Sequence, residues 1–232
     1  MMHDVFMQTY SGRVVHLVNP RADEIHIADI AHALSQTCRF AGHTPVFHSV
    51  AHHSVLVADL LGPDQRLALW GLLHDASEAY LHDLTRPLKR VLNMASPHSE
   101  DRRKALGEAF AHDLVDQHII TDRYWCTVAN TISDAIFEDR LGSGIGYAEL
   151  EHRMMAAVCT RFGLPHLMPS AVKTADNMVL ATEFRDLFHE SPDTCIRWAG
   201  AEPMDLVITP LSPEAAKDLF LRRFEQLTRR AA

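Results

Sequence analysis

Three ionisable side chains lie within an apolar helical pattern at residues 72–78, which read Leu-Leu-His-Asp-Ala-Ser-Glu. Leu67, Trp70 and His74 fall at positions i, i+3 and i+7, so the imidazole shares the face that points to the core. Asp75 and Glu78 follow in the same expected helix, which runs from after residue 64 to about residue 81. An unpaired buried carboxylate is costly, so the pattern predicts a bound cation or a hydrogen-bonded network that neutralises it. The alternative is a helix whose His and Asp satisfy backbone groups of the core.

The composition narrows the class of protein. A chain of 232 residues suits one large domain, or a domain with an insertion, and its formal net charge of −8 argues against a nucleic-acid partner. No apolar run approaches the roughly 20 residues that span a bilayer, and a signal-peptide pattern is absent, so we expect a cytoplasmic protein without a membrane partner. The cysteines are far apart, which fits a reducing compartment: Cys38, Cys126, Cys159 and Cys195.

The spacing of apolar residues predicts an all-α fold with a small N-terminal hairpin. The hairpin strands are expected at residues 13–18 and 25–27. Helices are expected from the N-cap Asp29 to about residue 39, over 49–61, from 147 to 162, and after Ser212-Pro213. Between them, residues 93–146 form an inserted segment with two amphipathic helices, at 100–117 and 122–139. This insertion is either a surface elaboration or a lid or dimer contact.

Two loops and one helix contribute further candidate site residues. His53 shares the inward face of the helix over 49–61, where a lone histidine is usually a core residue but here lies one helix before the His-Asp pair. Arg39 and Phe40 lie on the preceding loop, where a surface arginine and a packing phenylalanine are the simpler interpretation. Pro87 is expected to stop regular helix, so that Asp83 and Lys89 lie on a loop able to present charges to an anion.

Four motifs in order resemble the HD-domain phosphohydrolases. They are S-V-A-H-H-S ending after His53, H-D-A-S-E from His74, D-L-x-x-P-x-K from Asp83 to Lys89, and V-K-x-A-D ending at Asp176. The chain is most similar to the YfbR-like 5'-deoxynucleotidases and to phage-type dNTP phosphohydrolases, over residues 10–92 and 147–228. The resemblance therefore implies a single HD-type helical bundle over residues 1–232, interrupted by the insertion.

The resemblance also implies one divalent cation held by His53, His74, Asp75 and Asp176. Mixed nitrogen and oxygen ligands suit Mn, Co, Zn or Fe, with Mg as a further candidate, and leave positions open for water and phosphate. Asp134 is a rival for the fourth position, but the apolar stripe around it predicts that it faces solvent. Asp176 shares a helical face with valines at 172 and 179, which favours it.

By the same resemblance, Glu78 is the acid/base partner of the attacking water and Asp83 orients the water or the leaving group. Arg39 binds phosphate together with Lys89, and Phe40 contacts the sugar. Phe40 departs from the family pattern, in which this position more often holds a larger aromatic residue.

The expected function is a metal-dependent phosphohydrolase that releases phosphate from deoxynucleoside monophosphates by attack of a metal-bound water. Its partner is a small nucleotide, and we expect a homo-oligomer, a dimer or larger. One alternative is a dNTP triphosphohydrolase, for example a dATPase, that releases triphosphate. Alternatives from other classes are a non-catalytic nucleotide-binding HD protein and a di-iron HD oxygenase, for which the familiar spacing of additional histidine ligands is absent.

Overall fold

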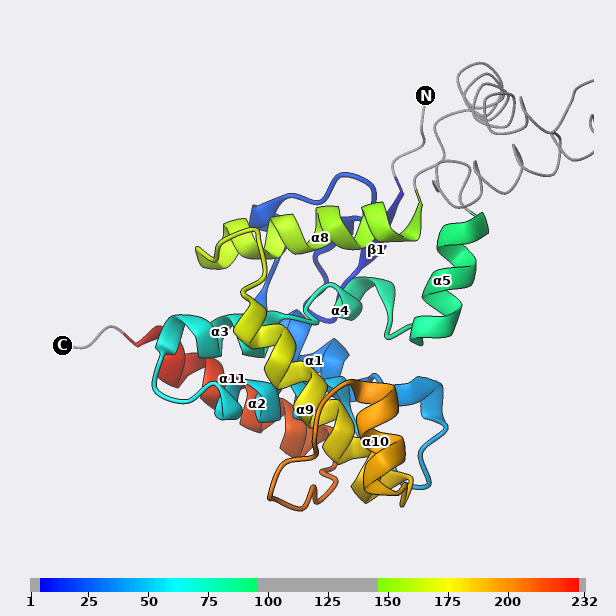
Figure 1. Cartoon of the computed structure of the whole chain (residues 1–232). Helices are drawn as coiled ribbons and strands as arrows, with labels where there is room; N and C mark the ends of the chain where they lie inside the picture. Colours follow the sequence, from blue (N-terminus) through cyan, green and yellow to red (C-terminus); the bar gives the residue numbers. More distant parts are fainter. Residues whose placement is uncertain (1–4, 96–145, 230–232) are drawn as a thin grey trace, which may run out of the picture. The chain divides into compact units, whose positions relative to one another are not determined.

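The computed structural model describes residues 5–95 and 146–229, and most of them are helical (Figure 1). The helices, in chain order, are α1 (Ile27–Gln36), α2 (Val50–Leu60), α3 (Gln65–Leu73), α4 (Glu78–Leu81), α5 (Arg86–Ala95), α8 (Tyr147–Phe162), α9 (Ser170–Leu187), α10 (Pro192–Ala199) and α11 (Pro213–Thr228). Short 3-10 helices cover Ala22–Glu24 and Arg39–Gly42. The predicted all-α class with a small N-terminal hairpin is confirmed.

The chain divides into two compact units, residues 1–84 with 153–232, and residues 85–152. The predicted insertion falls in the second unit, and its two expected helices lie outside the described residues. In the described ranges no helix is long and apolar enough to cross a membrane. The cysteines there are free thiols: Cys38, Cys159 and Cys195.

The hairpin pairs β1 (Phe6–Gln8) with β2 (Val14–His16) in antiparallel register. The strand expected at residues 13–18 is therefore confirmed, but its predicted partner at 25–27 is wrong. Gly12 has a φ of 81° in the turn between the strands, a conformation that glycine adopts at little cost, so β2 pairs with the segment before it. The chain after β2 forms a 3-10 turn instead, and the carboxylate of Glu24 accepts a hydrogen bond from the backbone N–H of His16 at 3.1 Å.

Helix α1 begins two residues before the predicted N-cap. His26 occupies the N-cap position, so the assignment of Asp29 as the cap is wrong. The buried carboxylate of Asp29 instead accepts hydrogen bonds from Ser11, through its N–H at 2.7 Å and its hydroxyl at 2.8 Å, and from the Thr9 hydroxyl at 3.0 Å. Asp29 thus fastens the hairpin turn to α1.

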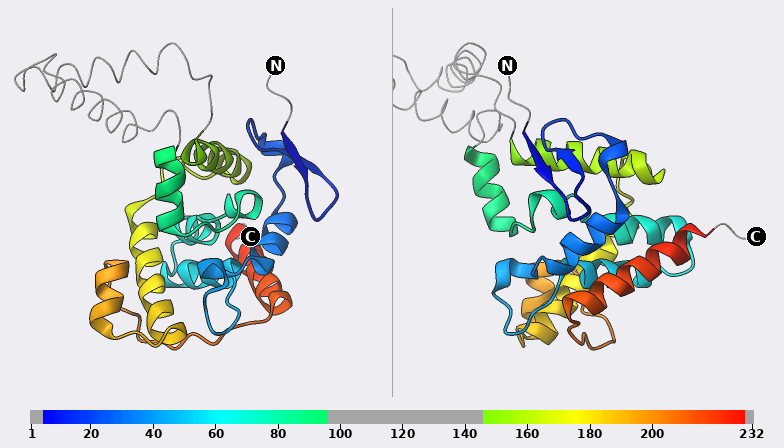
Figure 2. Two further views of the ribbon diagram at one scale, coloured as in Figure 1. Left: turned by 90° about the vertical axis from the view of Figure 1, so that its right-hand side faces the viewer. Right: turned by 180° about the vertical axis from the view of Figure 1, so that it is seen from behind.

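The core of the first unit forms where α11 lies along α1, α2 and α3 (Figure 2). Asp64 caps α3, because its carboxylate accepts from two backbone N–H groups of the first turn. Gly71 lets α3 approach α2 closely, since a Cβ there would come within 2.5 Å of Leu61 Cδ1 and 3.3 Å of Ala58 Cα. Helix α9 packs against both α2 and α3, and α10 packs on α9.

The expected single helix from residue 65 to 81 is wrong, because α3 ends at Leu73 and α4 begins at Glu78. Residues 74–77 form successive turns, with the N–H of Ala76 bonded to the carbonyl of Leu73 at 3.0 Å. The expected helix stop at Pro87 is also wrong. Pro87 lies in the first turn of α5, where its missing N–H needs no helical partner, so Lys89 is on a helix while Asp83 remains on the preceding loop.

Candidate metal centre

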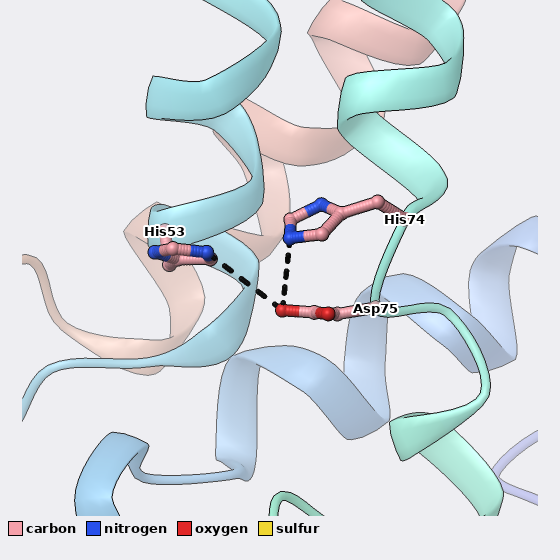
Figure 3. Close-up of side chains that lie close together, drawn as sticks. All are labelled: His53, His74 and Asp75. Carbon is pink, nitrogen blue, oxygen red and sulfur yellow. Dashed lines mark ion pairs between the residues drawn. The ribbon is translucent and has the colours of Figure 1, made fainter. Parts of the chain in front are cut away.

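Two separate segments bring three of the predicted donors together. His53 comes from α2, and His74 and Asp75 come from the turns directly after α3 (Figure 3). The Asp75 Oδ2 atom lies 3.1 Å from His74 Nε2 and 3.7 Å from His53 Nε2. These three side chains form a group that could hold a metal ion, with one donor atom of each within 4.8 Å of the others.

Asp176, on α9, approaches the same group. Its Oδ1 atom is 3.3 Å from His53 Nε2 and 3.8 Å from His74 Nε2, while its Oδ2 accepts from Lys173 Nζ at 2.6 Å. The structure thus brings together all four side chains that the resemblance implies as ligands. Its rival, Asp134, lies outside the described residues.

The two histidines point their Nε2 atoms into this group because each Nδ1 is already engaged. His53 Nδ1 lies 2.8 Å from Glu183 Oε1, and His74 Nδ1 lies 2.8 Å from the carbonyl oxygen of Gly71. Both acceptors hold the proton on Nδ1, which leaves the Nε2 lone pair for a cation. Neither buried Nε2 makes a hydrogen bond of normal geometry in the part of the chain that is described.

The donor set fits a divalent ion. Ligand bonds of about 2.0–2.2 Å place adjacent donors about 3.0–3.6 Å apart, close to the separations observed here. Two imidazole nitrogens with two carboxylate oxygens suit a transition metal better than calcium, which prefers oxygen ligands throughout.

Charge balance in the site also favours an added cation or protons. Burial alone would lower the pKa of His74, but Asp75 and Asp176 outweigh it and raise the pKa well above its usual value. Burial alone would raise the pKa of Asp176, but the adjacent imidazoles of His53 and His74 hold it far below the usual range. Without a cation the imidazoles therefore retain protons, and a bound metal would displace them.

Two predicted acidic residues follow this group in sequence. Glu78 is the first residue of α4, its side chain is buried, and its backbone N–H donates to the carbonyl of Asp75 at 2.9 Å. Asp83 lies on the loop after α4 and is near enough to Arg39 for its charge to contribute to raising the pKa of the guanidinium.

Arg39 is buried, contrary to the simpler interpretation of a surface arginine. Its side chain donates from Nη2 to Glu183 Oε2 at 2.8 Å, and its Nη1 lies 3.8 Å from Asp75 Oδ2. Burial would lower the pKa of this guanidinium, but Glu183, Asp83 and Asp75 outweigh it and raise the pKa. The side chain that the resemblance assigns to phosphate binding is thus held beside Asp75, one of the candidate metal ligands.

Sequence reasoning missed Glu183 and its contact with His48, and both residues are fully buried. Glu183 Oε1 lies 2.9 Å from His48 Nε2 as well as contacting His53. The sequence does contain a signal that Glu183 points to the core, because Val172, Asp176 and Glu183 fall at i, i+4 and i+11 on one helical face. A carboxylate on that face needs a buried partner.

Phe40 adopts a left-handed conformation, with a φ of 55°. Its ring packs against Phe184, with centroids 5.5 Å apart, and edge-on against Phe188 at 5.0 Å, while the Arg39 guanidinium lies 5.2 Å from its centre. Lys89 belongs to the second unit, where its Nζ pairs with Glu151 Oε1 at 2.7 Å.

No family model matches the chain. Two known proteins are similar to it. One is the uncharacterized protein RCAP_rcc00048 of Rhodobacter capsulatus, 30% identical over 181 residues that cover 75% of this chain and 66% of that protein. The other is the uncharacterized protein YfdR of Escherichia coli, 30% identical over 224 residues that cover 96% of each chain. The chain therefore belongs to the protein family of Escherichia coli YfdR.

Proposed function

We propose that the protein is a metal-dependent phosphohydrolase that releases phosphate from deoxynucleoside monophosphates. The convergence of two imidazole Nε2 atoms with carboxylate oxygens of Asp75 and Asp176 carries the proposal. The four motifs that resemble the HD-domain phosphohydrolases support it, because they include these same residues. The fold class is compatible with such a bundle.

His53, His74, Asp75 and Asp176 would hold one divalent ion, with Mn, Co, Zn, Fe or Mg as candidates. When bound, the ion would lower the pKa of a water molecule and bind a phosphate oxygen. The two carboxylates balance its charge. The Nδ1 contacts of His53 and His74 keep both rings oriented toward it.

Glu78 and Asp83 would handle the proton of the attacking water. Glu78 and Asp83 follow Asp75 closely in the chain, and Glu78 is buried. A carboxylate positioned beside the attacking water can take up its proton and return it to the leaving oxygen. Asp83, beside Arg39, would orient the water or the leaving oxygen. Each therefore has a role that does not require it to bind the ion.

Arg39 would stabilise negative charge on the phosphoryl group. Glu183 engages its Nη2, but its buried Nε has no hydrogen-bond partner in the described part of the chain, so the guanidinium retains donors for a phosphate oxygen. Phe40 lies directly beside it and would pack against the sugar. A phenyl ring could disfavour a ribonucleotide only by leaving the 2'-hydroxyl unsatisfied, which predicts a moderate preference for deoxy substrates.

The experiment is turnover of a panel of dNMPs and dNTPs, with and without Mn²⁺ or Co²⁺, followed by identification of the products. We expect inorganic phosphate from dNMPs, loss of turnover with a chelator, and no turnover in His74→Ala. Triphosphate from a dNTP would instead support the triphosphohydrolase alternative. Binding of nucleotides without turnover under any metal would refute the proposal and favour a non-catalytic protein.

A further inference from the structure

We infer that Glu183 is a positioning residue that connects the phosphate-binding Arg39 to the metal ligand His53 through the two oxygens of one carboxylate. The inference rests on the proposed function, and it adds a residue that none of the sequence motifs assigned. It is carried by contacts on both sides of the Glu183 carboxylate and by its complete burial.

The Oε1 atom of Glu183 orients the metal ligand His53. Oε1 lies 2.8 Å from His53 Nδ1 and accepts a hydrogen bond from it. This contact fixes the rotation of the ring, so that Nε2 points toward the Asp75 and Asp176 oxygens. It also favours the tautomer whose Nε2 lone pair would bind an ion held among these groups. An imidazole without this partner could turn, or place its proton on Nε2 and lose the ion.

The second side orients the arginine. Oε2 accepts from Arg39 Nη2 at 2.8 Å, while Nη1 of the same guanidinium lies 3.8 Å from Asp75 Oδ2. These contacts close a ring in which the carboxylates of Glu183 and Asp75 alternate with Arg39 and His53, because Asp75 Oδ2 lies 3.7 Å from His53 Nε2. A shift of Arg39 toward a phosphate would therefore be felt at the metal ligand through Glu183.

The backbone makes this arrangement rigid. Glu183 and Asp176 are seven residues apart on α9, two turns along one face, so a single helix supplies a metal ligand and the carboxylate that orients another. Glu183 and His53 are fully buried, so water cannot replace a lost contact without rearrangement of the core.

If the Arg39–Glu183 ion pair were purely structural, replacing Glu183 would alter the stability of the fold but leave the metal affinity of the folded protein unchanged. Glutamine separates the two roles, because it has nearly the same shape but only one acceptor oxygen. If the amide oxygen of the glutamine faces His53, its NH₂ group faces the donors of Arg39. If the amide is flipped, the NH₂ group faces the Nδ1 proton of His53 instead.

The experiment is a calorimetric Mn²⁺ titration of the metal-free, folded full-length protein and of two variants. Glu183→Gln should bind Mn²⁺ about 10- to 100-fold more weakly than the wild type. Glu202→Gln, which removes the same charge at an exposed loop position, should bind as the wild type does. Wild-type affinity in Glu183→Gln would overturn the inference while leaving the metal site intact. A wild type that binds no metal would overturn the proposed function as well, so the two failures are distinguishable.

If Glu183→Gln does not fold, a measurement on the wild type tests whether Glu183 orients His53. Long-range ¹H–¹⁵N correlation spectra of the Zn²⁺-loaded protein report the tautomer of each histidine. We expect His53 to carry its proton on Nδ1, with the shift of Nε2 typical of a metal-bound nitrogen. A His53 that is metal-bound through Nδ1, or protonated on Nε2, would overturn the inference.

Discussion

Replacing Arg39 with alanine should destabilise the fold strongly, although the residue was expected on a surface loop. Its guanidinium is the partner of Glu183, whose carboxylate is fully buried. Removing one member of a buried ion pair leaves the other charge without compensation, which typically costs about 3–5 kcal/mol. His48 and His53 remain as partners of that carboxylate, so we expect the lower part of that range.

A double-mutant cycle separates the charge from lost packing. In a Glu183→Gln background the carboxylate is no longer charged, so Arg39→Ala should cost less there than in the wild type. Residues in direct contact of this kind show coupling of about 0.5–3 kcal/mol. Additive effects would mean that the two side chains stabilise the fold independently.

The assay is urea denaturation followed by circular dichroism, with a chelator present so that metal binding does not contribute. Arg229→Ala is the matched control, because Arg229 pairs with Glu225 at 3.6 Å and both side chains are mostly exposed. An exposed pair of this kind contributes less than about 1 kcal/mol. An Arg39→Ala variant no less stable than the control would refute the assignment of a buried, structurally required arginine.

Three further predictions address the site and the hairpin. Asp176→Ala should lose the metal. If Asp176→Ala instead keeps one metal ion per chain while Asp134→Ala loses it, Asp134 is the fourth ligand. Glu78→Ala should keep metal and substrate but turn over roughly 10²-fold more slowly or worse, and near-normal turnover across pH would end its acid/base role. Burial would raise the pKa of Glu24, but hydrogen bonds from His16 outweigh it and lower the pKa, so the stability it contributes is present above its unfolded pKa and is lost as the pH falls. The difference in urea stability between wild type and Glu24→Gln should therefore shrink from neutral pH toward acid, and a constant difference would contradict this.

Local signals predicted α1, α2, α8 and α11. Ser212 was predicted as a helix cap, and its hydroxyl accepts a hydrogen bond from the backbone N–H of Ala215. Ser49 was predicted only as the approximate start of a helix, and its side chain caps α2 in the same way. Helical spacing placed His53 inward on one helix and Asp176 inward on another. These inferences succeeded because they depend on neighbours three to seven residues away, which the sequence displays directly.

The remaining features depend on contacts that spacing does not encode. The helix break after Leu73 could not be read from a continuous apolar pattern, because turns and helix share the same local spacing there. Arg39 and Glu183 are 144 positions apart, and only the packing of α9 against α2 and α3 brings them together. A sequence gives the face on which a charge lies, but its partner follows from the tertiary fold.

The most direct test of the proposed function is a Mn²⁺ titration in which bound metal and phosphate release from a dNMP are measured on the same preparation. We predict that turnover is absent in the metal-free protein and rises in proportion to bound Mn²⁺ until one ion is held per chain. Turnover that does not depend on metal, or one bound ion per chain without any phosphate release, would contradict the proposal.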